Sequence, residues 1–272
     1  MKLVCMVYLL TTVFSVAHTR DATTPPHNAS DQNWSDLALS GVSSCGAAVM
    51  SGVVGELRQR YAATGRTSPR RIIINPGEGT TGTRGVHGLA ECCGLHTWKW
   101  DNTARSILAA DPRTWEGLNF SSIMTKIEYA SDTPMAYLWP RVLATFPNAF
   151  VLHTTRNSSA WVRSRIRGHA QSVRPFGWAF GRVGHGINER DFHTTDPQRV
   201  ANADVLIDGL MYEAETSVAR CAVDQNRYLH LPMETLCEPA QRRAIATALR
   251  CLPEVAESAK CMAAMYCANS TR

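Results

Sequence analysis

The sequence predicts an α/β fold: a three-layer sandwich in which helices cover both faces of a central, mostly parallel sheet. The β-branched run Arg71–Asn75 is typical of a strand buried on both faces, and a glycine-rich turn follows it. The segment Ala149–Thr154 has the same character and lies between two helical patterns. Strands that alternate with helices favour parallel pairing through right-handed crossovers.

The remaining elements follow from hydrophobic periodicity. Apolar residues recur at helical spacing or alternate as in half-buried strands. Helices are expected at the end of Leu37–Tyr61 and over Val86–Cys93, Pro134–Phe146, Ala160–Arg167, Pro197–Arg220 and Pro239–Leu252; further strands are expected at His96–Trp100, Ile123–Tyr129 and Arg227–Leu231.

The N-terminal segment, residues 1–18, is expected to be a signal peptide. Lys2 precedes the apolar run Leu3–Ala17, which ends in small residues. The run is short for a membrane span of about 20 residues, so an uncleaved signal anchor is the alternative. Residues 19–36 are rich in Thr, Pro, Asn, Asp and Ser and are interpreted as a polar stem. Residues 37–272 then form a single domain.

Cysteine content agrees with a secretory route. Without Cys5 of the signal segment, the nine cysteines leave an even set, so disulfide bonds are expected. We expect the cluster Cys221–Cys267 to pair largely within itself. Zinc is disfavoured because no CxxC pair occurs and no histidine flanks the cysteines at ligand spacing. Glycosylation sequons begin at Asn28 and Asn33 in the stem, where glycans are expected, and also at Asn119, Asn157 and Asn269.

The net charge is +5 at pH 7, which suits a ligand that carries phosphate or sulfate. This charge is too small to indicate a nucleic-acid partner. After the N-terminal run, no segment is apolar enough to span a membrane, so contact with a membrane is expected only through an uncleaved anchor.

The segment Ile72–Gly85 carries the chemistry. A buried strand enters a Gly- and Thr-rich turn that opens a helix, so backbone N–H groups and the helix N-terminus can surround an anion. The hydroxyls of three threonines and the Arg84 guanidinium can add contacts to it. The spacing from Gly77 to Gly82 matches a nucleotide-triphosphate loop, but Thr83 and Arg84 replace the residues that hold phosphate and magnesium. A tight turn without a ligand is the alternative.

A second segment, Phe146–Ser164, places Arg156 just past a strand and Ser164 about two turns into the next helix. Open α/β sheets bind ligands at the carboxyl ends of their strands. Arg156 and Ser164 are therefore expected to face the same crevice as the glycine-rich turn.

Together these segments resemble the sulfotransferases that use 3′-phosphoadenosine-5′-phosphosulfate. The family has a strand followed by a Lys/Arg-[Ser/Thr]-Gly-Thr loop, to which Thr80–Thr83 is similar. It also has a strand, then Arg, then Ser eight residues later, as in Arg156 and Ser164. The lead-in Phe146–Ala149 and the helix opening Asp132–Pro134 are typical too. The resemblance covers residues 71–167 well and 228–252 more weakly.

The resemblance implies a P-loop NTPase-like sulfotransferase fold, with the phosphosulfate donor as co-substrate and no metal. In the family the first loop holds the 5′-phosphosulfate, and the Arg and Ser of the second motif hold the 3′-phosphate. The residues expected to bind the donor are Gly79, Thr80, Thr81, Gly82, Thr83, Arg84, Arg156 and Ser164.

One position departs from the family. Thr80 stands where a Lys or Arg usually stabilises the charge that develops as the sulfuryl group leaves. Arg84 or Lys99 are possible substitutes from another direction. A general base is also needed near the acceptor. Asp101 is the first choice and Asp132 the second, although Asp132 is also a typical helix cap; His87 and His96 are further options.

The sequence therefore predicts a sulfotransferase of the Golgi lumen, or a secreted one, that acts on a hydroxyl or amine of a carbohydrate or glycoprotein acceptor. Basic and aromatic residues in Ser172–Phe192 would suit a lid over a sugar, or form a solvated loop. An inactive, sulfotransferase-like binding or scaffold glycoprotein is the main alternative. A P-loop kinase or nucleotidase is the third, and it would require magnesium.

Overall fold

The structure is a computed structural model, and it describes residues 52, 54–99, 101–109, 115, 117–132, 135–168, 212–213, 216, 219–220 and 222–267. The expected signal peptide, the stem, the loop Ser172–Phe192 and most of the helix expected over Pro197–Arg220 lie outside these residues.

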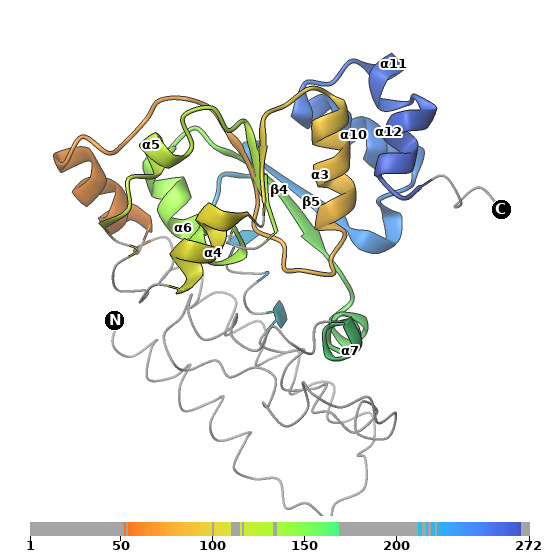
Figure 1. The fold of residues 1–272 in the computed structure, drawn as a ribbon, viewed down its shortest axis with the longest axis horizontal. Helices are drawn as coiled ribbons and strands as arrows, with labels where there is room; N and C mark the ends of the chain where they lie inside the picture. Colours follow the sequence, from red (N-terminus) through yellow and green to blue (C-terminus); the bar gives the residue numbers. More distant parts are fainter. Residues whose placement is uncertain are drawn as a thin grey trace, which may run out of the picture.

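Five strands form one parallel sheet in the order β2-β3-β1-β4-β5. Figure 1 shows helices on both sides of these strands, with α3, α10 and α12 on one side and α4, α5 and α6 on the other. The three-layer α/β sandwich predicted from the sequence is confirmed. The strands are β1 (Ile73–Asn75), β2 (Thr97–Trp98), β3 (Tyr129–Ser131), β4 (Phe150–Thr155) and β5 (Tyr228–Pro232).

A helix over residues 54–63 precedes β1, and most of the later helices lie close to their predicted positions. They are α3 (Thr83–Cys92), α4 (Asn102–Ala109), α5 (Phe120–Ile123), α6 (Met135–Thr145), α7 (Ser158–Gly168), α10 (Pro239–Leu249), α11 (Pro253–Ala256) and α12 (Ala259–Ala264), with the 3₁₀ turns η2 (Gln225–Arg227) and η3 (Met233–Thr235).

The strand expected over Ile123–Tyr129 is wrong except for its last residue. Ile123 ends the short helix α5, and β3 begins only at Tyr129. The side chain of Asn119 accepts a hydrogen bond from the backbone N–H of Ser122 and so caps α5. This local cap stabilises a helical turn where the β-branched residues alone favour a strand.

Alternate residues of the buried strands supply two separate cores. Ile74 of β1 packs with α4, α5 and α6, while Ile73 points to the opposite face and packs with α3, α10 and α12. Val151 and Leu152 of β4 divide in the same way. The continuous apolar runs in the sequence therefore reflect a sheet that is covered on both faces.

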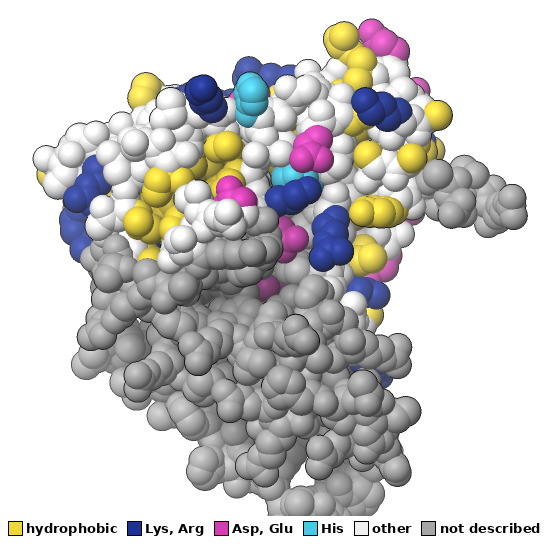
Figure 2. All heavy atoms as spheres, viewed as in Figure 1, with side chains coloured by type: hydrophobic (Ala, Val, Ile, Leu, Met, Phe, Trp, Pro, Cys, Tyr) yellow, Lys and Arg dark blue, Asp and Glu magenta, His cyan; other side chains and the backbone are white. Residues whose placement is uncertain are grey.

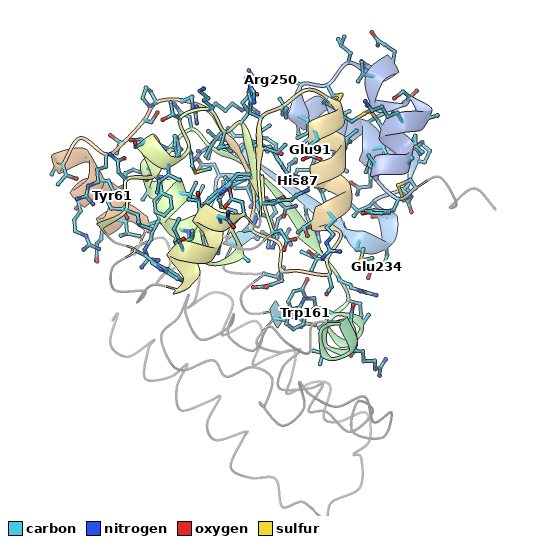
Figure 3. All side chains as sticks on the ribbon, viewed as in Figure 1. Tyr61, His87, Glu91, Trp161, Glu234 and Arg250 are labelled. Atoms are coloured by element: carbon cyan, nitrogen blue, oxygen red, sulfur yellow. A yellow bond between two sulfur atoms is a disulfide. The ribbon has the colours of Figure 1, made fainter. Side chains whose placement is uncertain are left out.

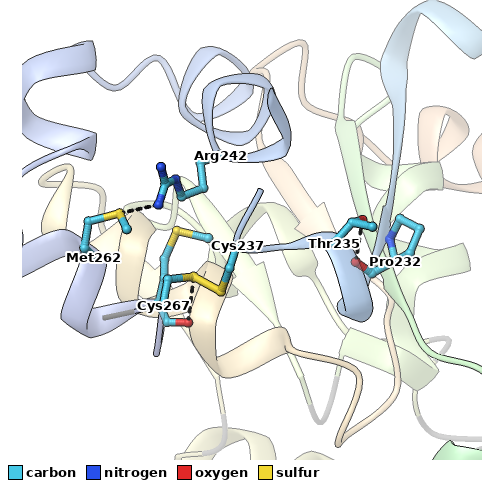
Figure 4. Close-up of a disulfide and its surroundings, with 7 residues drawn as sticks. Pro232, Thr235, Cys237, Arg242, Met262 and Cys267 are labelled. Atoms are coloured by element: carbon cyan, nitrogen blue, oxygen red, sulfur yellow. Dashed lines mark hydrogen bonds between the residues drawn. A yellow bond between two sulfur atoms is a disulfide. The ribbon is translucent and has the colours of Figure 1, made fainter. Parts of the chain in front are cut away.

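The C-terminal segment is bonded to helix α3 by disulfides. Cys92 pairs with Cys261 and Cys93 pairs with Cys251, while Cys237 pairs with Cys267 (Figure 4). Disulfide bonding is thus confirmed, but the expectation of pairing within the C-terminal cluster is wrong for Cys251 and Cys261. The reason is spatial, because the fold places α10 to α12 beside the C-terminal end of α3 (Figure 1).

In addition to the Cys92–Cys261 disulfide, close packing joins helix α3 to the end of α12. A Cβ added at Gly88 would lie 2.8 Å from the carbonyl oxygen of Ala264, and one at Gly85 would lie 3.0 Å from that of Met265. The glycines of α3 therefore let the two segments pack backbone against backbone. Among the helices of the described residues, none is both long and apolar enough to cross a membrane.

His153, a buried residue of β4, makes the stability of the folded protein sensitive to acid. Its ring nitrogen Nδ1 lies 2.8 Å from the hydroxyl oxygen of Tyr228 on β5. Burial, with a smaller contribution from the neighbouring His230, lowers the pKa of His153 to about 3. Below the ordinary histidine pKa of about 6.5, the unfolded chain therefore binds a proton that the folded protein does not accept.

We predict that the free energy of unfolding falls as the pH is lowered from about 6.5 towards 3, with His153 contributing about 1.4 kcal/mol per pH unit. His153→Asn retains a polar partner for Tyr228 but cannot titrate, so its urea-unfolding curve should show a shallower pH dependence. At pH 8 the unfolding free energies of variant and parent should change with pH at nearly the same rate. Equal slopes for variant and parent between pH 4 and 6 would contradict the assignment.

Candidate anion-binding site

The turn after β1 is organised by one buried side chain. Asn75 is the last residue of β1 and is fully buried. Its Oδ1 accepts hydrogen bonds from the N–H of Gly77 (2.9 Å) and from both the N–H (3.2 Å) and the hydroxyl (3.1 Å) of Thr154 on β4. Its Nδ2 lies 3.3 Å from the Tyr129 hydroxyl on β3. Asn75 therefore joins the turn to both neighbouring strands.

The backbone at Gly77 has no room for a side chain. A Cβ there would overlap the hydroxyl and carbonyl oxygens of Thr154. Thr81 adds another contact between the same segments, because its hydroxyl donates to the Glu78 carbonyl oxygen (2.6 Å) and lies 3.0 Å from the Thr154 hydroxyl. The turn is thus packed directly on the carboxyl end of β4.

Further along the turn, the backbone takes the shape of an anion-binding concavity. Thr80 and Gly82 both have left-handed backbone conformations, with φ of 73° and 92°. Alternating conformations of this kind direct successive N–H groups to one side. Gly82 is the N-cap of α3 and offers no side-chain hydrogen bond. Among the described residues, the N–H groups of Gly79, Thr80, Gly82, Thr83 and Arg84 have no hydrogen-bond acceptor.

Thr80 itself is strained. A β-branched residue is rarely found with positive φ, and strained conformations of this kind cluster at ligand-binding sites. The hydroxyl oxygen of Thr80 is also buried without a hydrogen-bond partner in the described part of the chain. A buried polar atom of this kind costs free energy unless it meets a partner. Both features fit a turn whose geometry serves a ligand.

The second predicted segment supports the turn directly. Arg156, just past β4, is partly buried, and its Nη1 donates to the Thr80 carbonyl oxygen (3.2 Å). Trp161 of α7 donates from Nε1 to the Gly79 carbonyl oxygen (3.1 Å), and its ring stacks on Tyr212 with centroids 4.4 Å apart. Figure 3 shows Trp161 beside α7, on the side toward the strands. The structure therefore brings the two segments together at one edge of the sheet.

The other residues predicted to bind the donor differ in their exposure and in their hydrogen bonds. The Thr81 hydroxyl makes hydrogen bonds to Glu78 and Thr154, and its role as a donor to phosphate stays a prediction. Thr83 is buried at the start of α3, and Arg84 is exposed beside it. Ser164 is partly buried on α7. Figure 2 shows Lys or Arg, Asp or Glu, and His side chains gathered over α3.

The two predicted bases lie at the ends of different strands. Asp101 follows β2; its Oδ1 accepts from the Ala104 N–H (2.7 Å) and its Oδ2 from Trp98 Nε1 (3.1 Å). One oxygen thus caps the start of α4, and the other holds the Trp98 side chain of β2. Asp132 follows β3, the strand next to β1, with a φ of 60°. Helices α3 and α6 leave β1 and β3 on opposite faces, which is the arrangement that opens a crevice between strand ends.

The two histidines considered as general bases, His87 and His96, lie in different parts of the fold. His96 precedes β2, at the amino edge of the sheet and opposite the turn. His87 is buried on α3, with Nδ1 3.0 Å from the Ser131 hydroxyl and Nε2 3.2 Å from a Glu91 carboxyl oxygen (Figure 3). Burial, followed by the charge of Lys99, lowers the pKa of His87. His87 is therefore neutral near pH 7 and connects α3 to the end of β3.

Sequence reasoning missed the residues that hold the turn in place. The sequence analysis gives Asn75 only as the end of a strand and Thr154 only as part of one, and it assigns no role to Trp161. A polar residue that ends an apolar strand just before Pro76 and Gly77 was a usable signal for Asn75. The roles of Thr154 and Trp161 depend on contacts between segments far apart in the sequence.

Fold and site together define an α/β protein with a candidate anion-binding turn between β1 and α3. Comparison with known families makes this more specific, because residues 80–195 match the family model described as a sulfotransferase domain. Residues 80–195 are therefore similar to a sulfotransferase domain, which bears out the resemblance seen in the sequence. The matched segment includes Thr80, Arg156 and Ser164 and extends beyond the described residues. No curated protein matches the chain.

We predict that Gly77→Ala destabilises the protein by roughly 2–4 kcal/mol, because the new methyl group must displace Thr154. Gly55→Ala is the matched control: the same methyl group meets no atom within 4 Å in the first helix and should be neutral or slightly stabilising. Chemical denaturation of both variants measures the difference. Similar stability of the two variants would show that the turn is not packed on β4 as described.

Proposed function

We propose that the protein transfers a sulfuryl group from 3′-phosphoadenosine-5′-phosphosulfate to a hydroxyl or amine of a carbohydrate or glycoprotein acceptor in the secretory pathway. The single observation that carries this proposal is the turn of Gly79–Arg84. All of its N–H groups except that of Thr81 lack acceptors among the described residues, and a guanidinium from the second motif reaches it. A phosphosulfate oxygen is the kind of ligand that such a turn accepts.

The reaction proposed is an in-line displacement at sulfur. The acceptor oxygen or nitrogen forms a bond to sulfur as the bond from sulfur to the bridging oxygen breaks. The electron pair of that bond remains on the 5′-phosphate, and the acceptor proton passes to a base. Backbone N–H groups of the turn would stabilise the charge on the departing phosphate.

Between the two predicted bases, Asp132 has the better position. It follows β3, which is the direct neighbour of β1, whereas Asp101 follows β2, one strand further away. Both carboxylate oxygens of Asp101 also accept hydrogen bonds from neighbouring residues, which leaves them less available to the proton of an acceptor. Both assignments remain predictions from the sequence.

The secretory location is supported by the disulfides. Three pairs link cysteines of the described residues, and such bonds persist in oxidising compartments. A glycoprotein or carbohydrate is an acceptor that such a location offers, either in the Golgi lumen or after secretion.

A second candidate function is a sulfotransferase-like protein that binds the donor or its product without turnover. Thr80 favours it, since the cation usual at this position is absent from the turn. Incubation with sulfur-labelled donor and a panel of glycan hydroxyl acceptors separates the two functions: labelled acceptor supports the enzyme, whereas binding without labelled acceptor supports the binding protein.

Binding of the donor product is testable by thermal shift with the secreted protein. Adenosine 3′,5′-bisphosphate at about a hundred times its dissociation constant should stabilise by roughly 2.7 kcal/mol, enough to raise the midpoint by a few degrees. Arg156→Ala should lose this shift, whereas Arg163→Ala, an exposed residue of α7, should keep it.

Magnesium-ATP is the comparator in the same titration. A midpoint that rises with magnesium-ATP and not with the bisphosphate would replace the proposal with a kinase or nucleotidase. A midpoint that rises with neither would leave the protein without a nucleotide donor site and end the proposal.

A further inference from the structure

One glycosylation sequon of the folded domain, Asn119–Ser121, has no part in the site described above. Asn119 is exposed, whereas its neighbours Leu118 and Phe120 pack on the core that lies beneath α4, α5 and α6. With a core residue on each side, the Asn119 amide is left facing solvent. A glycan is bulky and hydrophilic, so it requires an attachment site on the surface of this kind.

The Asn119 side chain makes its hydrogen bonds through one atom. Its Oδ1 accepts from the Ser122 N–H (3.3 Å) and from the Ser121 hydroxyl (2.7 Å). Its Nδ2 donates to no acceptor among the described residues. An N-glycosidic bond takes one of the two hydrogens of Nδ2 and leaves Oδ1 as it is. The cap of α5 and a glycan are therefore compatible on the same side chain.

Asn119 is also well separated from the anion-binding turn. The residues that follow α5 lie at the amino edge of the sheet, where the Arg70 guanidinium, just before β1, donates to the carbonyl oxygens of Met124 and Ile127. The turn after β1 lies at the carboxyl edge instead. Figure 1 shows α5 at the end of the strands opposite α7. A glycan on Asn119 would therefore leave the donor edge open.

The sequon that begins at Asn157 lies at the donor edge itself. Asn157 directly follows Arg156, whose guanidinium donates to the Thr80 carbonyl oxygen. The Asn157 N–H donates to a Glu234 carboxyl oxygen (3.1 Å), and its Oδ1 accepts from the Ala160 N–H (3.1 Å). A glycan on this side chain would stand beside the anion-binding turn and hinder the entry of a ligand. The two sequons therefore differ in what a glycan would do to the site.

We propose that Asn119 is an N-glycosylation site of the folded domain and that Asn157 stays unmodified. The first part rests on the proposed secretory location, and the second on the proposed donor site. The sugar donor is an oligosaccharide carried on a lipid pyrophosphate. Asn119 Nδ2 forms a bond to C1 of the first sugar as the bond from that carbon to the pyrophosphate oxygen breaks. The electron pair stays on the pyrophosphate, and one amide proton passes to a base of the transferring enzyme.

Peptide mass spectrometry of the full secreted chain reads the occupancy of each sequon. The chain is expressed in a host that glycosylates secreted proteins and is then treated with peptide N-glycosidase in heavy-oxygen water. The enzyme converts each glycosylated asparagine to a labelled aspartate, which distinguishes it from spontaneous deamidation. We expect conversion at Asn119 and at the stem positions Asn28 and Asn33, and none at Asn157.

Ser121→Ala separates the glycan from the helix cap. It removes the sequon but leaves the Asn119 Oδ1 to accept from the Ser122 N–H. On a denaturing gel the variant should migrate as a chain with one glycan fewer, and it should coincide with the parent after glycosidase treatment. Ser121→Thr keeps the sequon and should keep the glycan. Ser159→Ala, the matched change in the sequon of Asn157, should leave the mobility unchanged.

Unmodified Asn119 in a protein whose stem carries glycans would overturn the inference and leave the secretory location intact. A protein without a glycan at any sequon would contradict the secretory location, and the inference would fail with it. Glycosylation of Asn157 would overturn the second part. If that glycosylated protein still binds adenosine 3′,5′-bisphosphate, the proposed function survives this result, because the donor edge then tolerates a glycan.

Discussion

The hydrogen bonds of the Asn75 side chain are the constraint on which the rest of the site depends. Its carbonyl oxygen accepts from the turn and from β4, and its amide reaches β3, so three strands and the turn share one buried residue. Because Asn75 and Thr154 are fully buried, each of these groups needs a partner within the protein. The turn between β1 and α3 therefore has its shape set by neighbouring strands before any ligand is present.

Helix α3 is held at both ends, which lets this turn keep a strained backbone. At its C-terminal end, Cys92 and Cys93 are bonded to the C-terminal segment, and at its start Gly82 lies against Leu236. Arg156 and Trp161 secure the carbonyl groups on the other side of the turn. Packing and covalent links thus offset the cost of the positive φ at Thr80, as expected for a preorganised binding site.

The layers of the fold were predictable because they depend on local patterns. Ile72–Ile74 and Val151–Leu152 read as buried strands, and the helices between them have a clear period. The short helix α5 was missed, since its cap at Asn119 outweighs the β-branched residues that follow. The disulfide partners and the contacts of Thr154 and Trp161 could not be predicted, because they join segments distant in sequence. The sequence predicted that Thr80 and Arg156 lie at the same edge of the sheet, but it could not predict the hydrogen bond between them.

The most direct measurement of the central claim is a crystal structure of the protein with adenosine 3′,5′-bisphosphate. The account predicts the 5′-phosphate in the turn after β1, with its oxygens within hydrogen-bonding distance of the N–H groups of Gly82, Thr83 and Arg84. A bisphosphate bound elsewhere, with those N–H groups still without an acceptor, would contradict the account.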